Sequence, residues 1–259
     1  MKHLPRVIPV LLISDGALVK TVKFANPVYL GDPVNIIRIF NEKEVDEIII
    51  IDLEASKKNR PPDFGYVSDM ASECFMPVTY GGGVKTLDHA EKLFRAGVEK
   101  ISVQTGFRDD PGLIDQLART FGSQSLVASI DVKVDWLRRK RPWSYDNQSF
   151  LNISVFDQVR KLIEYGVGEI FINSVDRDGT MEGFDLQMIA QLAKVSSVPF
   201  TMAGGLGSLE DIRSAWQLGV SGVAGGAFFV FQGPHRAVLP TYPSLHLIKQ
   251  VCLEGKTGG

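Results

Sequence analysis

Two strand-like segments of the chain resemble each other, and they differ at the residue with the greatest chemical consequence. The segment Val7–Ile13 reads VIPVLLI, and the segment Leu126–Lys133 reads LVASIDVK. The second segment carries Asp131 near its end, whereas the first carries Leu12 at the corresponding place. A lone carboxylate can accept or donate a proton, and a facing pair can divide the acid and base roles. Leu12 therefore decides whether proton-transfer chemistry is complete in this chain.

Glycine-rich turns indicate phosphate binding near the same segments. The turn at Gly81–Gly83 precedes one helical pattern, and Gly204-Gly205 precedes another 122 residues later. Backbone N–H groups at such turns converge on an anion, and the positive end of the helix adds to the attraction. Each turn alone could be a plain tight turn, but the pairing at one offset favours a ligand with a phosphate at each end. The candidate phosphate contacts are Gly82, Gly83, Thr105, Gly204, Gly205, Gly225 and Gly226.

The elements that must position these residues are short β-branched runs alternating with longer amphipathic runs. Eight such units in about 250 residues are typical of a single α/β domain folded as a (β/α)8 TIM barrel. A doubly wound open sheet is the alternative, but no G-x-G-x-x-G turn follows the first strand. The predicted strands are Val7–Leu12, Glu47–Asp52, Pro77–Tyr80, Lys100–Val103, Leu126–Asp131, Glu169–Ser174, Pro199–Met202 and Gly222–Gly225, and predicted helices include Leu87–Ala96, Pro111–Phe121, Phe156–Gly166 and Leu186–Val195.

An internal repeat supports the barrel. The segment Phe94–Val103 resembles Trp216–Gly225, at the offset that also relates the two glycine turns. Two half-barrels, about 1–122 and 123–250, would produce this pattern within one domain spanning 1–259. Residues 255–259 are expected to form a frayed tail. Polar residues at the predicted strand ends should then gather at the C-terminal face, where TIM barrels place their active sites. In addition to the phosphate-contact residues named above, the residues at these strand ends include Asp52, Gln104, Asp131, Asp176 and Gly179.

Composition excludes several classes of function. The 259 residues are 44% apolar and 22% charged, with a formal net charge of −2, which argues against nucleic acid as a partner. The two cysteines, Cys74 and Cys252, are too few for a disulfide framework and have no metal-ligand spacing, so no metal is expected. No cofactor is expected either. The N-terminus lacks the apolar run of a signal peptide, and no segment could span a bilayer. A cytoplasmic location is therefore expected.

Several motifs together resemble the HisF family, the cyclase subunit of imidazole glycerol phosphate synthase. The likeness covers nearly the whole chain, and Asp176–Thr180, which reads DRDGT, is its most specific part. The sister isomerase of histidine synthesis matches these motifs less well. The segments that carry the resemblance are Arg6–Pro9, Asp46–Ile48, Ile51–Ser56, Gly81–Gly83, Phe121–Gln124, Ile130–Lys133 and Ser174–Thr180.

The resemblance implies a function for each end of the barrel. In this family, ammonia from a separate glutaminase subunit crosses the barrel and joins a phosphorylated aminoimidazole nucleotide at the strand-end face. Asp131 matches the second of two catalytic aspartates, whereas Leu12 stands where the family has the first. At the opposite face, Glu99 matches the surface that docks the glutaminase. The ring of charges that resembles the family's ammonia gate consists of Arg6, Glu47, Lys100 and Glu169.

Two further segments follow predicted strands on the active side. Lys20 and the loop Thr21–Gly31 stand where the family has a mobile lid over the substrate, and Lys20 is a candidate substrate contact. Trp136–Trp143, which reads WLRRKRPW, is predicted to be a basic hairpin. Such a run is usually a solvated face, but here it could contact a nucleotide substrate or a downstream enzyme.

The pattern as a whole resembles an offshoot of the family from bacterial surface-polysaccharide gene clusters, where the barrel and a HisH-like glutaminase accompany an N-acetyl-sugar amidotransferase. The leading hypothesis is therefore a lyase-like amidotransferase subunit, in a heterodimer, that supplies ammonia for sugar amidination in O-antigen or other lipopolysaccharide synthesis. One alternative is a working histidine-pathway cyclase that tolerates Leu12. Another is a non-catalytic barrel that only activates the glutaminase. The sequence identifies neither the ammonia acceptor nor the occupancy of both phosphate sites.

Overall fold

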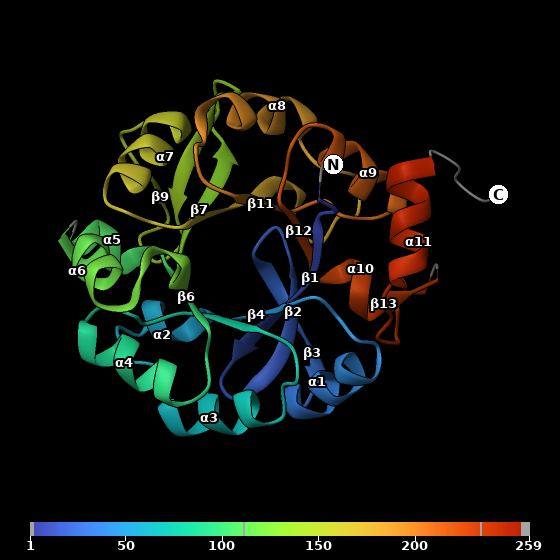
Figure 1. Ribbon diagram of the computed structural model, residues 1–259, viewed down its shortest axis with the longest axis horizontal. Helices are drawn as coiled ribbons and strands as arrows, with labels where there is room; N and C mark the ends of the chain where they lie inside the picture. Colours follow the sequence, from blue (N-terminus) through green and yellow to red (C-terminus); the bar gives the residue numbers. More distant parts are fainter. Residues whose placement is uncertain (1–2, 111, 234, 255–259) are drawn as a thin grey trace.

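The computed structural model describes residues 3–110, 112–233 and 235–254, and within them eight parallel strands close into a barrel (Figure 1). Neighbouring strands pair in the order β10-β11-β12-β1-β4-β5-β6-β7, and β7 pairs with β10 to close the ring. This closure confirms the predicted (β/α)8 fold and excludes the open sheet. The strands are β1 Arg6–Ser14, β4 Ile48–Asp52, β5 Val78–Gly81, β6 Lys100–Val103, β7 Leu126–Val134, β10 Glu169–Ser174, β11 Phe200–Ala203 and β12 Gly222–Gly225.

Helices surround the barrel and present their apolar faces to the strands. The long ones are α1 Pro33–Glu42, α3 Phe64–Ser72, α4 Leu87–Arg95, α6 Gly112–Phe121, α7 Val155–Glu164, α8 Leu186–Val195 and α9 Leu209–Gln217. Shorter ones are α2 Leu53–Lys57, α5 Thr105–Asp109, α10 Ala227–Val230, α11 Leu245–Lys249, η1 Ser123–Ser125, η2 Val175–Arg177 and η3 Gln250–Glu254. The four helices predicted from periodicity are all present; Pro111, the expected start of one, lies outside the described residues.

The two-fold repeat is visible in the strand register. Leu12 pairs with Ile51 across β1 and β4, and Asp131 pairs with Asn173 across β7 and β10. Ile51 and Asn173 are 122 residues apart, so Leu12 and Asp131 occupy equivalent places in the two halves. The repeat extends to the helices. The side chains of Thr86 and Ser208, 122 residues apart, cap α4 and α9 by accepting a hydrogen bond from the backbone N–H three residues later. The exact half-barrel boundaries remain a prediction, and residues 255–259 lie outside the described part.

Two separate apolar cores hold the barrel together. The larger one lies between the strands and the helices, as in other barrels of this class. The smaller one fills the inside of the barrel with side chains from six of the eight barrel strands. Its buried members are Ile8, Ile49, Val127, Phe171, Ala203 and Ala224. This part of the barrel interior is therefore apolar.

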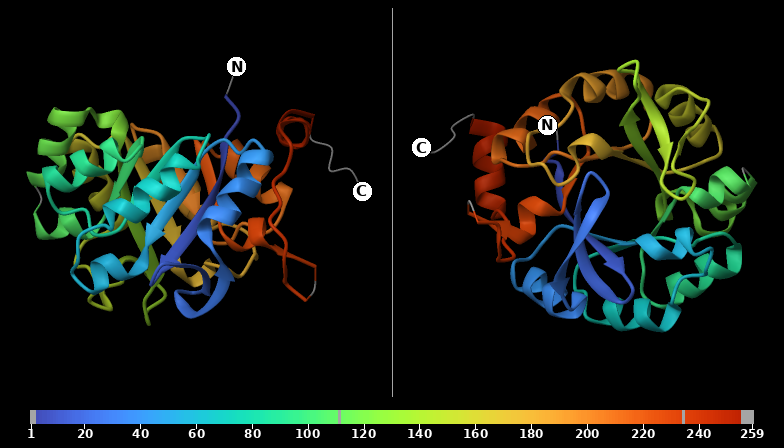
Figure 2. Two further views of the ribbon diagram at one scale, coloured as in Figure 1. Left: turned by 90° about the horizontal axis from the view of Figure 1, so that it is seen from below. Right: turned by 180° about the vertical axis from the view of Figure 1, so that it is seen from behind.

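Three hairpins project from the face opposite the N-terminus (Figure 2). They are β2 Ala17–Val22 with β3 Ala25–Gly31, the end of β7 with β8 Lys140–Ser144 and β9 Ser149–Phe150, and β13 Phe231–Gln232 with β14 Ala237–Val238. The segment Thr21–Gly31, expected to be a loop, is instead mostly paired strand, because β2 continues the sheet antiparallel to the end of β1. The predicted basic hairpin is present. Within the described residues, no helix is long and apolar enough to cross a membrane.

Candidate functional site

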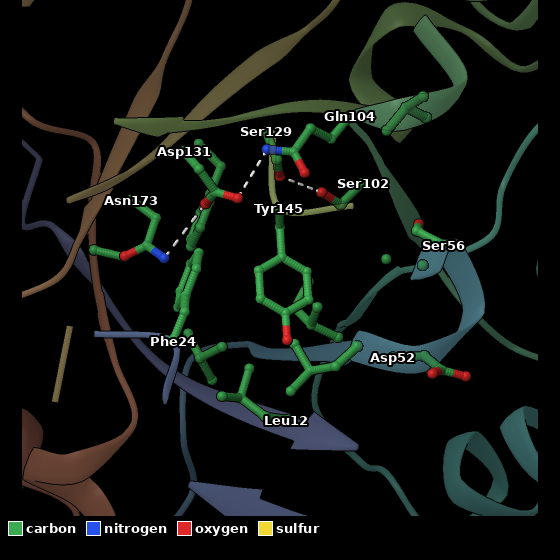
Figure 3. A pocket seen from close by; sticks show the side chains of 18 of the residues that line it. Leu12, Phe24, Asp52, Ser56, Ser102, Gln104, Ser129, Asp131, Tyr145 and Asn173 are labelled. Carbon is green, nitrogen blue, oxygen red and sulfur yellow. Dashed lines mark hydrogen bonds between the residues drawn. The ribbon is translucent and has the colours of Figure 1, made fainter. Parts of the chain in front are cut away.

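A pocket opens at the C-terminal ends of the barrel strands, and both Leu12 and Asp131 line it (Figure 3). Its other lining residues include most of the predicted ones: Lys20, Asp52, Gly82, Gly83, Gln104, Gly204, Gly225 and Gly226. Three predicted residues, Asp176, Gly179 and Gly205, are not among the lining residues, although Asp178 and Gly204, close to them in the chain, are. The side chain of Thr105 lies outside the described part, although its backbone starts α5.

Asp131 is held by two amide side chains from the neighbouring strands. Its Oδ2 accepts a hydrogen bond from Gln104 Nε2 at 2.9 Å, and its Oδ1 accepts one from Asn173 Nδ2 at 3.5 Å (Figure 3). Burial raises the pKa of Asp131 to about 6, because the two amide donors only partly offset the lost solvation of the charge. A carboxyl group with such a pKa can exchange a proton near neutral pH, as a general acid or base must.

Leu12 faces the same pocket from β1 but offers only hydrocarbon. It is 8% exposed, and Val10 and Ile51 line the pocket beside it. Asp15 does not replace the missing carboxylate, because it is exposed in the following turn and pairs with Lys58 at 2.6 Å. Neither Leu12 nor Asp15 therefore supplies a carboxylate to the pocket opposite Asp131.

Asp52 lies in the pocket, but its carboxylate is already engaged. Its Oδ1 accepts hydrogen bonds from the backbone N–H groups of Glu54 and Ala55, both at 3.0 Å, and so caps helix α2. Arg60 Nη2 pairs with its Oδ2 at 2.9 Å. These contacts explain Asp52 as a structural residue, and they leave it poorly placed to take over the role of a second catalytic acid.

The glycine turns are required by close packing in both halves. A Cβ at Gly82 would collide with the carbonyl oxygen of Asp52, and one at Gly204 would collide with that of Ser174. Both glycines also have positive φ angles, 121° and 84°, which other residues rarely adopt. Packing alone thus accounts for glycine at these positions. Their backbones still border the pocket, so phosphate binding stays a prediction.

Lys20 enters the pocket from β2 and pairs with a residue that the sequence reasoning left unassigned. Its Nζ lies 3.0 Å from Asp178 Oδ1, and Thr21 Oγ1 donates to Asp178 Oδ2 at 3.1 Å. Gly226 makes room for this lysine, since a Cβ there would press against Lys20 Cε. The DRDGT motif was the available signal for Asp178, but spacing alone did not distinguish it from Asp176, which accepts a hydrogen bond from the Val134 N–H instead.

Aromatic rings and hydroxyl groups complete the pocket. Phe24, at the β2–β3 turn, packs edge-on against Tyr145, at the β8–β9 turn, with ring centroids 5.6 Å apart. In Figure 3 both rings lie over the space between Leu12 and Asp131. Ser102 and Ser129 share a hydrogen bond between β6 and β7, also within the lining. Neither pair carries a sequence motif, because each is formed between elements that are distant along the chain.

Comparison with known proteins decides the family. A model of the family described as "Histidine biosynthesis protein" matches residues 6–234. An imidazole glycerol phosphate synthase subunit HisF of Exiguobacterium sibiricum is 34% identical over 86% of this chain and 90% of its own length. The chain belongs to the HisF family. Two relatives provisionally named as the same subunit are more similar: hisF2 of Pseudomonas aeruginosa, 48% identical over 93% of this chain and 96% of its own length, and HisF of Leptospira interrogans, 46% identical over 93% and 95%.

At the opposite end of this HisF-family barrel, the four charges expected to form a ring do meet. Arg6 donates to both Glu47 and Glu169, and Lys100 Nζ lies 3.3 Å from Glu47 and 3.1 Å from Glu169. Burial disfavours the charge of Glu169, but Arg6 and Lys100 outweigh it and lower the pKa of this carboxyl group. Glu99, the predicted docking residue, is exposed on this side and accepts a hydrogen bond from the Val78 N–H at 2.6 Å.

No metal site accompanies these groups. Within residues 3–110, 112–233 and 235–254, no cluster of three His, Cys, Asp or Glu side chains is arranged to hold a metal ion. The pocket itself offers a carboxyl group that can exchange a proton, Asp131, and polar or ionic contacts for a ligand.

Proposed function

We propose that this HisF-family subunit delivers ammonia and does not itself complete the formation of imidazole glycerol phosphate. A HisH-like glutaminase would bind the face that carries Glu99 and the charge ring, and ammonia would cross the barrel to the Asp131 pocket. The acceptor would be the acetamido group of a sugar: during surface-polysaccharide synthesis, an N-acetyl-sugar amidotransferase would activate its carbonyl oxygen with a nucleoside triphosphate, and ammonia would displace the activated oxygen to form the acetamidino group. The observation that carries this proposal is that Leu12, which is apolar, and Asp131, which can exchange a proton, line one pocket from equivalent positions in the two halves.

The barrel interior supports delivery of ammonia in its neutral form. The inner core between the charge ring and the pocket is apolar, so an ammonium ion would lose its hydration there without a partner. Neutral ammonia has a much smaller solvation cost. Beyond this core, the hydroxyl pair of Ser102 and Ser129 and then the carboxyl group of Asp131 offer the next polar contacts. Asp131 can hold or return a proton as ammonia reaches the pocket.

The charge ring would have to open for ammonia to pass. Thr79 donates to Glu47 at 2.8 Å and Thr201 donates to Glu169 at 2.7 Å, so each acid is anchored from its own half. Arg6 and Lys100 then bridge the two acids. A swing of Lys100 away from the ring would leave both glutamates still paired with Arg6. This makes Lys100 the cheapest part of the ring to move.

The test is a reconstitution of three purified proteins: this chain, its glutaminase and the sugar amidotransferase. With 15N-amide glutamine, an N-acetyl sugar and a nucleoside triphosphate as substrates, the label should enter the sugar only when all three proteins are present. Entry of label at the same rate without this chain would overturn the proposal.

A working histidine-pathway cyclase is the second candidate, because Asp178 adds another carboxylate to the pocket near Asp131. Its ion pair with Lys20 leaves the Asp178 carboxylate already engaged, which argues against a role as the missing acid. Complementation of a histidine auxotroph by this chain would establish the second candidate.

A further inference from the structure

The β7–β8 hairpin carries an exposed apolar tip that the pocket chemistry does not use. Trp136 is 86% exposed and Leu137 48% exposed, and Val134 beside them is also exposed. Large exposed aromatic side chains are uncommon on a surface without a partner, and tryptophan is enriched among the residues that dominate protein interfaces. The tip is therefore a candidate contact surface.

The turn that presents this tip is held in one conformation. Asp135, whose side chain is 1% exposed, accepts hydrogen bonds from the backbone N–H groups of Leu137 and Arg139, both at 2.9 Å. Its Oδ2 also pairs with the Arg139 guanidinium at 2.8 Å. A tip that is already ordered loses little conformational entropy when a partner binds.

The hairpin is strongly basic although the whole chain is slightly acidic. Residues 133–141 contain five basic side chains and one acidic one, the buried Asp135, whereas the chain has a net charge of −2. Three of the basic groups already have partners in this chain: Lys133 lies over the Trp143 ring at 4.3 Å, Lys140 pairs with Asp185 at the start of α8, and Arg141 donates to the Leu151 carbonyl oxygen. Arg138 at the turn has no acidic partner among the described residues. A complementary surface would carry Asp and Glu around an apolar cleft.

The hairpin rises directly from the mouth of the pocket. Asp131, which lines the pocket, pairs with Trp143 within the hairpin, and Tyr145 at the far end of β8 lines the pocket too. The loop at Asp176–Gly179 ties its base to the other projecting segments, since Asp176 accepts from the Val134 N–H and the Asp178 carbonyl accepts from the Lys23 N–H. Figure 2 shows the tip on the side away from the N-terminus, where ammonia would leave the barrel.

We propose that this hairpin tip docks the enzyme that consumes the ammonia, through an apolar cleft rimmed by carboxylates that receives Trp136 and Leu137. This inference rests on the proposed function. Ammonia released into water is protonated and diluted, so a partner seated over the pocket mouth would keep it neutral and confined. A protein partner fits better than a membrane. A bilayer against the tip would cover the mouth of the pocket without receiving ammonia, and three of the cationic groups are already engaged by other residues of this chain.

Direct binding tests the docking surface apart from the function. The complex of this chain with its glutaminase is titrated with purified N-acetyl-sugar amidotransferase, using wild type, Trp136→Ala, Arg138→Glu and the control Leu253→Ala. Leu253 is equally apolar and 58% exposed, but it lies in the C-terminal η3 turn. The dissociation constant should rise at least tenfold for Trp136→Ala, as for an interface hot spot, and severalfold for Arg138→Glu, with the second effect shrinking at high salt. The control should bind like wild type.

Nitrogen transfer provides the second arm. At dilute protein, Trp136→Ala should lower the labelled nitrogen that reaches the sugar and raise free ammonium, while glutamate release stays at the wild-type rate. Added ammonium chloride should restore amidination, because it bypasses docking.

The possible outcomes separate the docking surface from the proposed function. Binding and nitrogen transfer at wild-type levels in the hairpin variants would overturn the docking surface and leave the proposed function intact. Loss of binding by these variants to vesicles of phosphatidylcholine and phosphatidylglycerol, with transfer unchanged, would instead assign the tip to a membrane. Docking without any transfer by wild type would contradict the proposed function alone.

Discussion

The two halves of the barrel differ most where their strands reach the pocket. In the second half, Asp131 is paired in register with Asn173, whose amide donates to it. In the first half, the equivalent residues are Leu12 and Ile51, both apolar. The change in this HisF-family chain is therefore wider than the loss of one carboxylate: the neighbouring strand offers no hydrogen-bond donor to support one.

A third pair of equivalent residues extends the difference. Gln104, which donates to Asp131, stands at the N-cap of α5, and Gly226 stands 122 residues later at the N-cap of α10. The space that Gly226 leaves is taken by Lys20 from β2. The surroundings of Asp131 thus present a carboxyl group with two amide donors, whereas the equivalent surroundings of Leu12 present hydrocarbon and a cation that is already paired.

The opposite end of the barrel keeps its two-fold arrangement. Glu47 and Glu169, 122 residues apart, each accept a hydrogen bond from the threonine of the next strand, Thr79 or Thr201. The acids and threonines are therefore two-fold, although both cations of the ring, Arg6 and Lys100, come from the first half. The strand ends at the pocket are not two-fold, and the proposed separation of ammonia delivery from pocket chemistry rests on this contrast.

Removing the one remaining acid should have the largest effect. Asp131→Asn keeps the shape of the side chain but cannot exchange a proton, and loss of a general acid or base typically costs about 10²–10⁴ in rate. We expect glutamine-dependent nitrogen transfer to fall by about 100-fold or more, with glutamate release preserved.

The matched variant in the other half is Leu12→Met, which retains an apolar side chain of similar size. Its transfer rate should stay within about twofold of wild type. Equal nitrogen-transfer rates for Asp131→Asn and wild type would mean that the pocket takes no part in the chemistry. This result would favour the alternative of a non-catalytic barrel that only activates the glutaminase.

The charge ring should show the next largest effect, this time on stability. Arg6→Ala removes a guanidinium that contacts Glu47 and Glu169, and it leaves two buried carboxylates with only Lys100. Breaking such a buried pair typically costs about 3–5 kcal/mol. Urea unfolding at pH 7 should show a loss near the lower end, because Arg6 is partly exposed. A decrease in the free energy of unfolding of less than about 1 kcal/mol would mean that water, rather than Arg6, stabilises the charges of these two glutamates.

Restoring a carboxylate should not restore the symmetry of the halves. Leu12→Asp buries a charged group beside Val10 and Ile51, with no amide donor in reach of the kind that Asp131 has. Thermal unfolding should show a destabilisation of about 2–3 kcal/mol. Formation of imidazole glycerol phosphate should not appear. Its appearance in this single variant would show that one carboxylate was all that the first half lacked.

The smallest effect is the pH dependence of stability at Asp131. Its pKa is raised to about 6 in the folded state, so the folded protein binds a proton more tightly than the unfolded chain. Stability is then lost as the pH rises from about 4 to about 7 and both states deprotonate. Because the pocket is open to solvent, we expect Asp131→Asn to gain only about 1–2 kcal/mol on wild type over this range. If the free energies of unfolding of wild type and Asp131→Asn changed in parallel with pH, the raised pKa of Asp131 would be contradicted.

Sequence patterns predicted the barrel and most of its pocket because both depend on short-range signals. Continuous apolar runs such as Ile48–Ile51 identify buried parallel strands, and helix starts such as Thr86 follow glycine turns at fixed spacing. The positions of Leu12 and Asp131 followed from the repeat, since the register of a barrel strand fixes which face each residue takes.

Residues that depend on tertiary contact were not predictable in this way. Asn173 lies within an ordinary strand pattern, and only its pairing with Asp131 across β7 and β10 gives it a role. The contact of Phe24 with Tyr145 joins two turns that are distant in sequence. The hairpin nature of Thr21–Gly31 was missed because NPVY and its neighbours carry no strong strand alternation, and pairing with the end of β1 determines it.

The most direct measurement compares the two products of a two-protein mixture. This chain and its glutaminase are supplied with glutamine and the phosphorylated aminoimidazole nucleotide of the family reaction, and glutamate and imidazole glycerol phosphate are measured in the same samples. With proton chemistry confined to Asp131 and Leu12 opposite, we expect glutamate to accumulate without imidazole glycerol phosphate. Formation of the two products in equal amounts would contradict the separation of ammonia delivery from cyclase chemistry.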